Sequence, residues 1–189
     1  MSPEAATSRY VVDPAQSRIT LKVSAGGALA FLGHSPRIAA RDYSGSLEVG
    51  PEGVAGSRVR VVVAANSLAV LDDMKAKDRE EIESRTREEV LETDRYPEIS
   101  FASDSVHVSS QNENRYVLQI GGTFLLHGVS QHETISAQVF FNGGTVRAVG
   151  EFRLKQSAYR VKPASALGGG LTVKDELVCT FDILAHREA

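Results

Sequence analysis

The chain has 189 residues, of which 42% are hydrophobic and 24% charged, and its formal net charge is −3. This ordinary composition argues against a disordered or low-complexity chain, and the small negative charge leaves no basic footprint for a nucleic acid or an anionic membrane surface. No uncharged stretch is long enough to cross a bilayer as a helix, so we expect neither a nucleic-acid partner nor a membrane span.

Hydrophobic and polar residues alternate along most of the chain, which is typical of half-buried strands. The first such run covers residues 17–23. Asn-Gly-Gly at residues 142–144 predicts a hairpin, because these residues tolerate positive φ. Further alternating runs, separated mostly by Gly, Asn, Pro or Ser, cover residues 44–49, 58–65, 98–103, 115–126, 133–142, 145–155 and 171–185.

Only residues 71–94 break this alternation. The segment is rich in acidic and basic residues, has few apolar positions, and ends before Tyr96 and Pro97. A proline disfavours helical conformation in the residue before it, so the pattern predicts one or two short exposed helices near residues 72–94. The charges form either a solvated helical face or an acidic patch that binds a protein partner.

No change in composition and no long linker divides the chain, which predicts one domain over residues 10–186 after a flexible N-terminus of residues 1–9. Long alternating antiparallel strands in a chain of this size favour a barrel over a sandwich. The predicted fold is therefore all-β, a single antiparallel barrel of about eight strands. With no Trp and 7 Phe, its interior is either underfilled, and then a site for an apolar ligand, or fully packed.

Strand register places one set of apolar side chains inside this barrel. Alternate residues of the later runs are apolar, whereas those between them, such as Gln119, Gln138 and Arg147, are polar. If the interior is hollow, the inner set lines one continuous tunnel. The predicted lining comprises Phe31, Leu118, Ile120, Phe124, Ile135, Val139, Phe141, Val146, Phe152, Leu154, Leu171, Val173 and Phe181.

Several short motifs add to this pattern. In their order and spacing over residues 10–185 they resemble the YceI-like family. The resemblance implies a lipocalin-like barrel whose elongated apolar tunnel binds a polyisoprenoid chain, and a protein that forms dimers. The motifs are YVVDPAQSRI at residues 10–19, GHSPRI at 33–38, YSGSL at 43–47, NSL at 66–68, YPEISFAS at 96–103, GTFLLHGVS at 122–130 and VKDEL at 173–177.

Basic residues cluster in sequence around the glycine-rich turn that precedes the last run. They are either ordinary surface charge or a cationic rim that meets an anionic lipid head while the tail enters the tunnel. The candidate rim residues are Arg153, Arg160, Lys162 and Lys174.

His34, His127 and His132 are the candidates for a histidine cluster. Imidazoles bind transition metals, and three of them around an open coordination position would support hydrolytic or redox chemistry. Their spacing lacks a compact metal signature, because His34 is distant in sequence from the other two. Structural or hydrogen-bonding roles are therefore favoured, and a metal-dependent enzyme is the alternative.

The single cysteine, Cys179, excludes an intrachain disulfide and fits a reducing compartment. The first residues lack the apolar core and basic flank of a secretory signal, so a cytoplasmic location is expected.

We predict a non-enzymatic protein, a homodimer without metal or other cofactor, that binds a long-chain isoprenoid, an isoprenoid quinone or a similar amphiphilic lipid for carriage, storage or sequestration. The alternatives are a metal-dependent enzyme and an interaction module acting through the charged helical insert.

Overall fold

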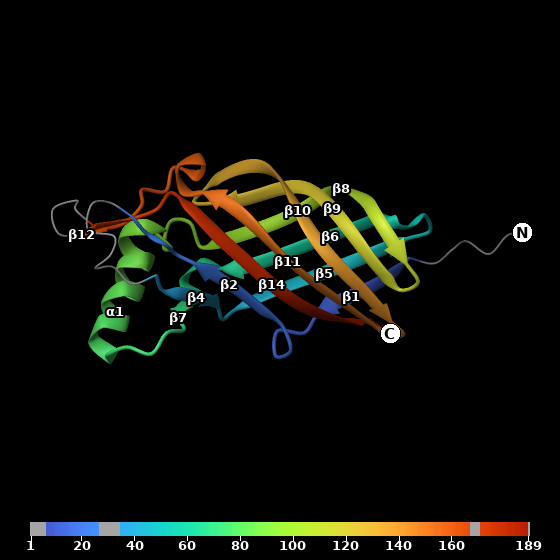
Figure 1. The fold of residues 1–189 in the computed structure, drawn as a ribbon, viewed down its shortest axis with the longest axis horizontal. Coiled ribbons are helices and arrows are strands. Elements are labelled where there is room, and N and C mark those ends of the chain that lie inside the picture. Colours follow the sequence, from blue (N-terminus) through green and yellow to red (C-terminus); the bar gives the residue numbers. More distant parts are fainter. Residues whose placement is uncertain (1–6, 27–34, 167–170, 189) are drawn as a thin grey trace, which may run out of the picture.

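Eight strands form a closed antiparallel barrel in the computed structural model, which describes residues 7–26, 35–166 and 171–188 (Figure 1). Strand β1 closes the ring, because it pairs with β5 on one side and with the C-terminal end of β14 on the other. The prediction of an all-β, lipocalin-like barrel of about eight strands is confirmed. In ring order the strands are β1 (Ser8–Val12), β5 (Tyr43–Gly50), β6 (Gly53–Ala64), β8 (Glu98–Asn112), β9 (Arg115–Leu126), β10 (Val129–Asn142), β11 (Thr145–Lys155) and β14 (Glu176–Arg187).

Shorter strands extend the barrel at the end where helix α1 lies in Figure 1. Beyond the end of β1, residues 178–182 of β14 pair with β2 (Arg18–Lys22). Strand β2 pairs in turn with β4 (Arg37–Ala40), and β4 pairs with β7 (Leu68–Val70). A separate small sheet consists of β12 (Ser165–Ala166), β13 (Leu171–Val173) and β3 (Ala25–Gly26).

Helix α1 (Ala76–Arg85) continues into a π-helical turn, η3 (Thr86–Val90), which confirms the predicted helical insert near residues 72–94. No residue of α1 is buried, and polar contacts help to attach the helix to the barrel. The Glu83 carboxylate accepts a hydrogen bond from the Val70 N–H of β7 at 2.8 Å. The Arg79 guanidinium donates to the Asp72 carbonyl at 3.0 Å. Two 3₁₀ turns, η2 (Ala65–Ser67) and η4 (Gln156–Tyr159), follow β6 and β11.

Tight turns connect β8, β9, β10 and β11 in sequence. In the β10–β11 hairpin Asn142 pairs with Thr145 and Gly143 has a φ of 57°, which confirms the predicted hairpin. The β9–β10 turn consists of His127 and Gly128, with φ values of 51° and 71°. Positive φ at both positions matches the twist of the flanking strands. Such turns fix the strand register, and hence which residues point into the barrel.

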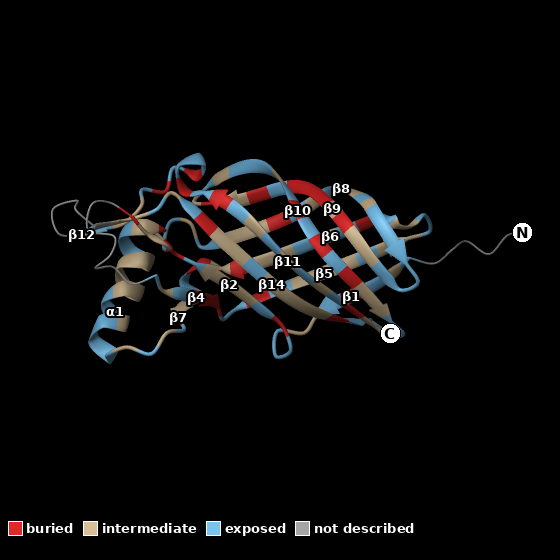
Figure 2. Ribbon diagram, in the orientation of Figure 1, coloured by how far each residue is buried: buried red, intermediate tan, exposed pale blue. Residues whose placement is uncertain are grey.

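Buried residues recur along the barrel strands, and most of them belong to one apolar cluster inside the barrel (Figure 2). In β11, for example, Val146 and Leu154 are buried whereas Arg147 is exposed. Gly150 interrupts the inner row of this strand. A side-chain carbon there would collide with the ring of Phe181, so the glycine gives that ring room inside the barrel.

The N-terminal strand begins earlier than the sequence pattern suggested. Ser8 and Arg9 were expected in a flexible N-terminus, but they belong to β1 and pair with Val49 and Glu48 of β5. This ordering follows from closure of the barrel, because backbone groups of β5 find their partners in β1. In the described parts of the chain, no helix has the length and apolar character needed to cross a membrane.

The predicted run over residues 171–185 is divided into β13 and β14 at Lys174 and Asp175. The break has a structural role. The Asp175 carbonyl accepts a hydrogen bond from the Gln156 N–H at 2.9 Å, and its carboxylate accepts one from the Ser157 N–H at 2.7 Å. The interruption therefore holds η4 against the end of the barrel.

Candidate functional site

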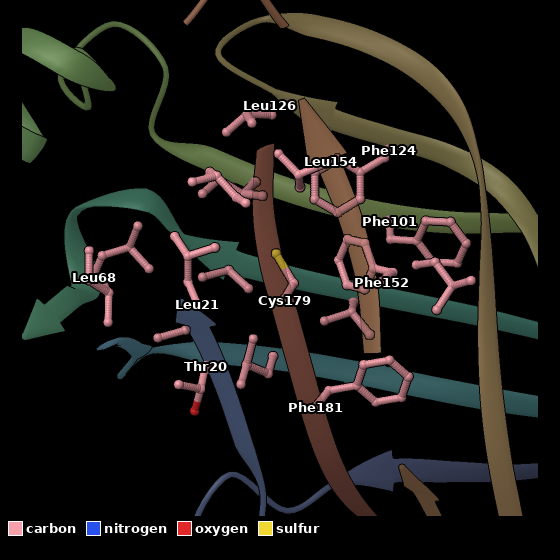
Figure 3. Close-up of a pocket in the computed structure, with 18 of the residues that line it drawn as sticks. Thr20, Leu21, Leu68, Phe101, Phe124, Leu126, Phe152, Leu154, Cys179 and Phe181 are labelled. Atoms are coloured by element: carbon pink, nitrogen blue, oxygen red, sulfur yellow. The ribbon is translucent and has the colours of Figure 1, made fainter. Parts of the chain in front are cut away.

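A cavity of about 770 Å³ runs through the inside of the barrel. Aliphatic and aromatic side chains from every barrel strand form its walls. Along one wall the rings of Phe124, Phe152 and Phe181 follow one another, with centroids 5.8 and 6.5 Å apart (Figure 3). The volume lies in the upper part of the range of about 300–1,000 Å³ that is usual for ligand sites. The cavity therefore has the size and surface to hold an apolar chain.

The predicted tunnel residues whose side chains the structure describes all line this cavity. Phe31 lies outside the described residues, and so does the side chain of Leu171, where β13 begins. Contact of these residues with a ligand stays a prediction. The lining residues among them are Leu118, Ile120, Phe124, Ile135, Val139, Phe141, Val146, Phe152, Leu154, Val173 and Phe181.

Several inward-facing side chains are only half-buried. Phe152, Cys179 and Phe181 line the cavity, whereas their neighbours Arg153 and Thr180 are exposed on the outside. Their accessible surface therefore faces the hollow rather than the surrounding solvent. Of the two interiors that the sequence allowed, fully packed and hollow, the structure has the hollow one.

The thiol of Cys179 lies within this apolar wall, beside Phe152 in Figure 3. Burial raises its pKa to about 12, because a thiolate would lose hydration there without gaining a cationic partner. The thiol therefore stays protonated near neutral pH. A protonated thiol is a poor nucleophile and a poor metal ligand, so Cys179 acts as a wall residue.

Helix α1 and the residues around it line one end of the cavity, which we call the mouth. The charged members here are Asp78, Glu81 and Arg85, and Arg85 is paired with Glu89 at 3.4 Å. Sequence reasoning predicted the helix but not its contact with the cavity. The available signal was a small set of apolar residues within the charged run. These residues are Met74, Ile82, Val90 and Leu91.

Three aromatic rings gather at the opposite end. Phe141 lines the cavity, and the rings of Tyr10 and Tyr116 pack edge-on against it, with centroids 6.2 and 5.5 Å away. Tyr10 is buried, and the three rings pack together over this end of the cavity. We call this the closed end. It lies beside the β10–β11 hairpin, far from α1 in Figure 1.

The turn η4 adds a rigid polar anchor near the mouth. The Gln156 side chain is buried against the cavity and donates a hydrogen bond to the Lys174 carbonyl at 2.9 Å. Tyr159 is fully buried and its hydroxyl donates to the Glu133 carboxylate at 2.7 Å. Burial, together with this hydrogen bond, raises the pKa of Tyr159 well above its usual range. Both polar groups therefore have internal partners.

The four predicted rim cations lie outside the cavity lining. Arg153 pairs with Glu176 at 2.9 Å on the outer surface, and its side chain is 61% exposed. Arg160 adopts a φ of 57° at the end of η4, and it is exposed, as are Lys162 and Lys174. Their contact with a lipid head stays a prediction.

Among the candidate histidines, His34 lies outside the described residues. His127 Nε2 is 2.8 Å from the Glu92 carboxylate, and His132 Nε2 is 3.2 Å from the Asp104 carboxylate. The two rings thus bind carboxylates from different elements. Within the described part of the chain, no three His, Cys, Asp or Glu side chains are placed to hold a metal ion together.

A closed antiparallel barrel with a long apolar interior defines a lipocalin-like protein. Residues 10–185 match the YceI-like domain, and the chain belongs to this family. The resemblance seen in the motifs is therefore confirmed. No curated protein matches the chain.

Solved structures share the fold at low sequence identity. BcnA of Burkholderia cenocepacia has a TM-score of 0.72 at 18% identity, covering 92% of this chain and 98% of its own. A polyisoprenoid-binding domain from Saccharophagus degradans, implicated in plant cell wall breakdown, has a TM-score of 0.67 at 14% identity, covering 95% and 98%. The YCEI protein of Campylobacter jejuni has a TM-score of 0.59 at 13% identity, covering 80% and 84%.

Proposed function

We propose that this protein binds a long-chain isoprenoid, an isoprenoid quinone or a similar amphiphilic lipid inside the barrel, without catalysing a reaction. The observation that carries the proposal is the continuous apolar cavity of about 770 Å³, to which every barrel strand contributes. The polyisoprenoid-binding domain of Saccharophagus degradans, which has the same fold, supports the choice of ligand class.

Burial of the lipid tail supplies the binding free energy. Each methylene removed from water contributes about 0.8 kcal/mol, so about ten of them contribute about 8 kcal/mol before the cost of ordering the chain. The row of Phe124, Phe152 and Phe181 provides an extended wall for such contacts. The tail can therefore be held tightly with few polar contacts.

The chemistry of the described lining favours binding over catalysis. The Cys179 thiol is protonated near neutral pH, because its pKa is raised to about 12. His127 and His132 are engaged with carboxylates and lie outside the cavity lining. The proposal therefore assigns carriage, storage or sequestration of the lipid to the protein.

The proposal also includes a homodimer in the cytoplasm. The single cysteine suits a reducing compartment, and the family resemblance of the motifs supports the dimer. Sedimentation velocity at several protein concentrations tests the dimer, and fractionation of the producing cells tests the compartment.

Native mass spectrometry of the purified protein, followed by extraction into organic solvent, tests the function. The expected result is one lipid of isoprenoid type per chain, released by the solvent and taken up again when added back. Stoichiometric transition metal without lipid, or failure to take up any isoprenoid, would contradict the proposal.

A further inference from the structure

One buried hydroxyl in the described wall of the cavity has no hydrogen-bond partner. Ser57 lies on the inner face of β6, lines the cavity, and is only 6% exposed. Its Oγ is buried and unbonded. A buried hydroxyl without a partner lowers the stability of the folded chain, so its presence in an apolar wall needs a reason.

Two other polar side chains of the lining have partners. The buried Gln156 amide donates to the Lys174 carbonyl, and the half-buried Thr86 hydroxyl donates to the Ile82 carbonyl at 2.7 Å. Among described residues the other buried unbonded side-chain atoms are Arg79 Nε and His127 Nδ1, and neither residue lines the cavity. Among the described lining residues, Ser57 is therefore the one with a buried polar side-chain atom that has no hydrogen-bond partner.

Ser57 belongs to the closed end of the cavity. It follows the β5–β6 hairpin, whose turn joins Gly50 to Gly53, and this hairpin points away from α1 (Figure 1). Val54, at the start of the same strand, also lines the cavity. A ligand that enters at the mouth therefore reaches Ser57 with its leading end.

The mouth is poorly suited to an anionic head. Asp78 and Glu81 line it, and Arg85, the only cationic side chain among the described lining residues, is already paired with Glu89. A phosphate at the mouth would therefore lie beside carboxylates. An ionised group at the closed end is also disfavoured, because a single hydroxyl does not compensate for the loss of hydration of a charge.

We propose that Ser57 Oγ is a polar anchor at the closed end, where it donates a hydrogen bond to an uncharged oxygen on the leading end of the ligand. The ligand class is a long apolar chain that carries a carbonyl, ether or hydroxyl oxygen at that end. Because Oγ has almost no accessible surface in the ligand-free protein, the hydroxyl reaches the ligand by rotation about χ1, which has three staggered wells. The proposal rests on the proposed function, because it places an anchor within the same cavity.

Positional isomers of one ketone test the anchor. Hexadecan-2-one carries its carbonyl next to the chain end, whereas hexadecan-8-one has the same composition with the carbonyl at mid-chain. Displacement of a fluorescent apolar probe from the purified protein measures both affinities. We expect hexadecan-2-one to bind about 5- to 10-fold more tightly than its isomer, which is the usual net effect of one buried hydrogen bond.

Two substitutions identify the hydroxyl as the cause. In Ser57→Ala the preference for hexadecan-2-one should disappear, while hexadecane binds at least as tightly as before and the ligand-free protein becomes more stable to urea. Ser57→Thr keeps the hydroxyl and should keep the preference. The matched control is Val59→Ala, which lies on the same face of β6 and should weaken both ketones equally.

Equal binding of the two isomers by the unsubstituted protein would overturn the anchor, and so would a preference that survives in Ser57→Ala. In either case, binding of hexadecane would still support the apolar cavity as the ligand site. Failure of the unsubstituted protein to bind any of the three probes would instead contradict the proposed function itself.

Discussion

Replacing Ala148 by phenylalanine tests whether the hollow of the barrel is the ligand site. Ala148 lies on β11, lines the cavity, and is flanked by Val139 of β10 and Ile183 of β14, which also line it. A ring attached at this position projects into open space. It therefore blocks the cavity without the overpacking that a filled core would suffer.

The expected magnitude follows from the displaced chain. A phenyl ring excludes about six ligand carbons, and at about 0.8 kcal/mol for each methylene the ligand loses about 5 kcal/mol, or more than about a thousandfold in Kd. The same ring gains contacts with the walls of the ligand-free protein. Its burial should raise the free energy of unfolding by about 1 to 3 kcal/mol.

The next residue on the strand provides the matched control. Val149 points outward and is 38% exposed. Val149→Phe should therefore change neither the binding free energy of the ligand nor the free energy of unfolding by more than about 0.5 kcal/mol. Displacement of a fluorescent isoprenoid gives the affinity, and urea unfolding of ligand-free protein gives the stability. Undiminished isoprenoid binding by a folded Ala148→Phe protein would refute the assignment of the cavity as the site.

Three further predictions concern groups around the cavity. Tyr159→Phe removes the hydrogen bond to Glu133 and should lower the free energy of unfolding by about 1 to 2 kcal/mol in urea titrations; no change would show that water replaces the bond. Glu83→Ala leaves the Val70 N–H without its partner, so exchange of that amide in deuterated buffer should accelerate about tenfold, unless α1 stays docked without the contact. The pKa of Cys179 is raised in the folded state from 9.0 to about 12, so the contribution of the protonated thiol to stability is complete below about pH 9 and is lost as pH rises toward 12. The free energy of unfolding of Cys179→Ala should therefore decline less steeply over that range. Identical pH profiles for the two proteins would count against a buried thiol.

The long C-terminal strands could be predicted because their determinants are local. Strands β9 and β11 have the bounds that the alternation gave, residues 115–126 and 145–155. In both, a period of two separates inner from outer side chains, and turn residues such as Gly143 set the pairing. The same register places Phe152 and Phe181 on the inner face from the local pattern alone, without any tertiary contact.

The strand that closes the barrel could not be predicted in this way. Strand β1 is five residues long and pairs with β5 and with β14, which lies at the opposite end of the sequence. Strands β4 and β7 are shorter still, and their pairing depends on neighbours already in place. In the charged insert only isolated apolar residues such as Ile82 and Val90 mark the side that faces the cavity, and their pattern was too sparse to predict that contact.

Composition alone did not decide between a packed and a hollow interior. The arrangement of the phenylalanine rings shows how the interior stays hollow. Phe124, Phe152 and Phe181 follow one another along one wall, edge-on or tilted, and Gly150 gives room for the last of them. The backbone hydrogen bonds of a closed barrel are satisfied between strands, so the wall holds without a filled core. An empty apolar cavity nevertheless forfeits contacts that a packed core would make. An apolar ligand restores these contacts. The cavity that lowers the stability of the empty protein is therefore also the reason that ligand binding raises it.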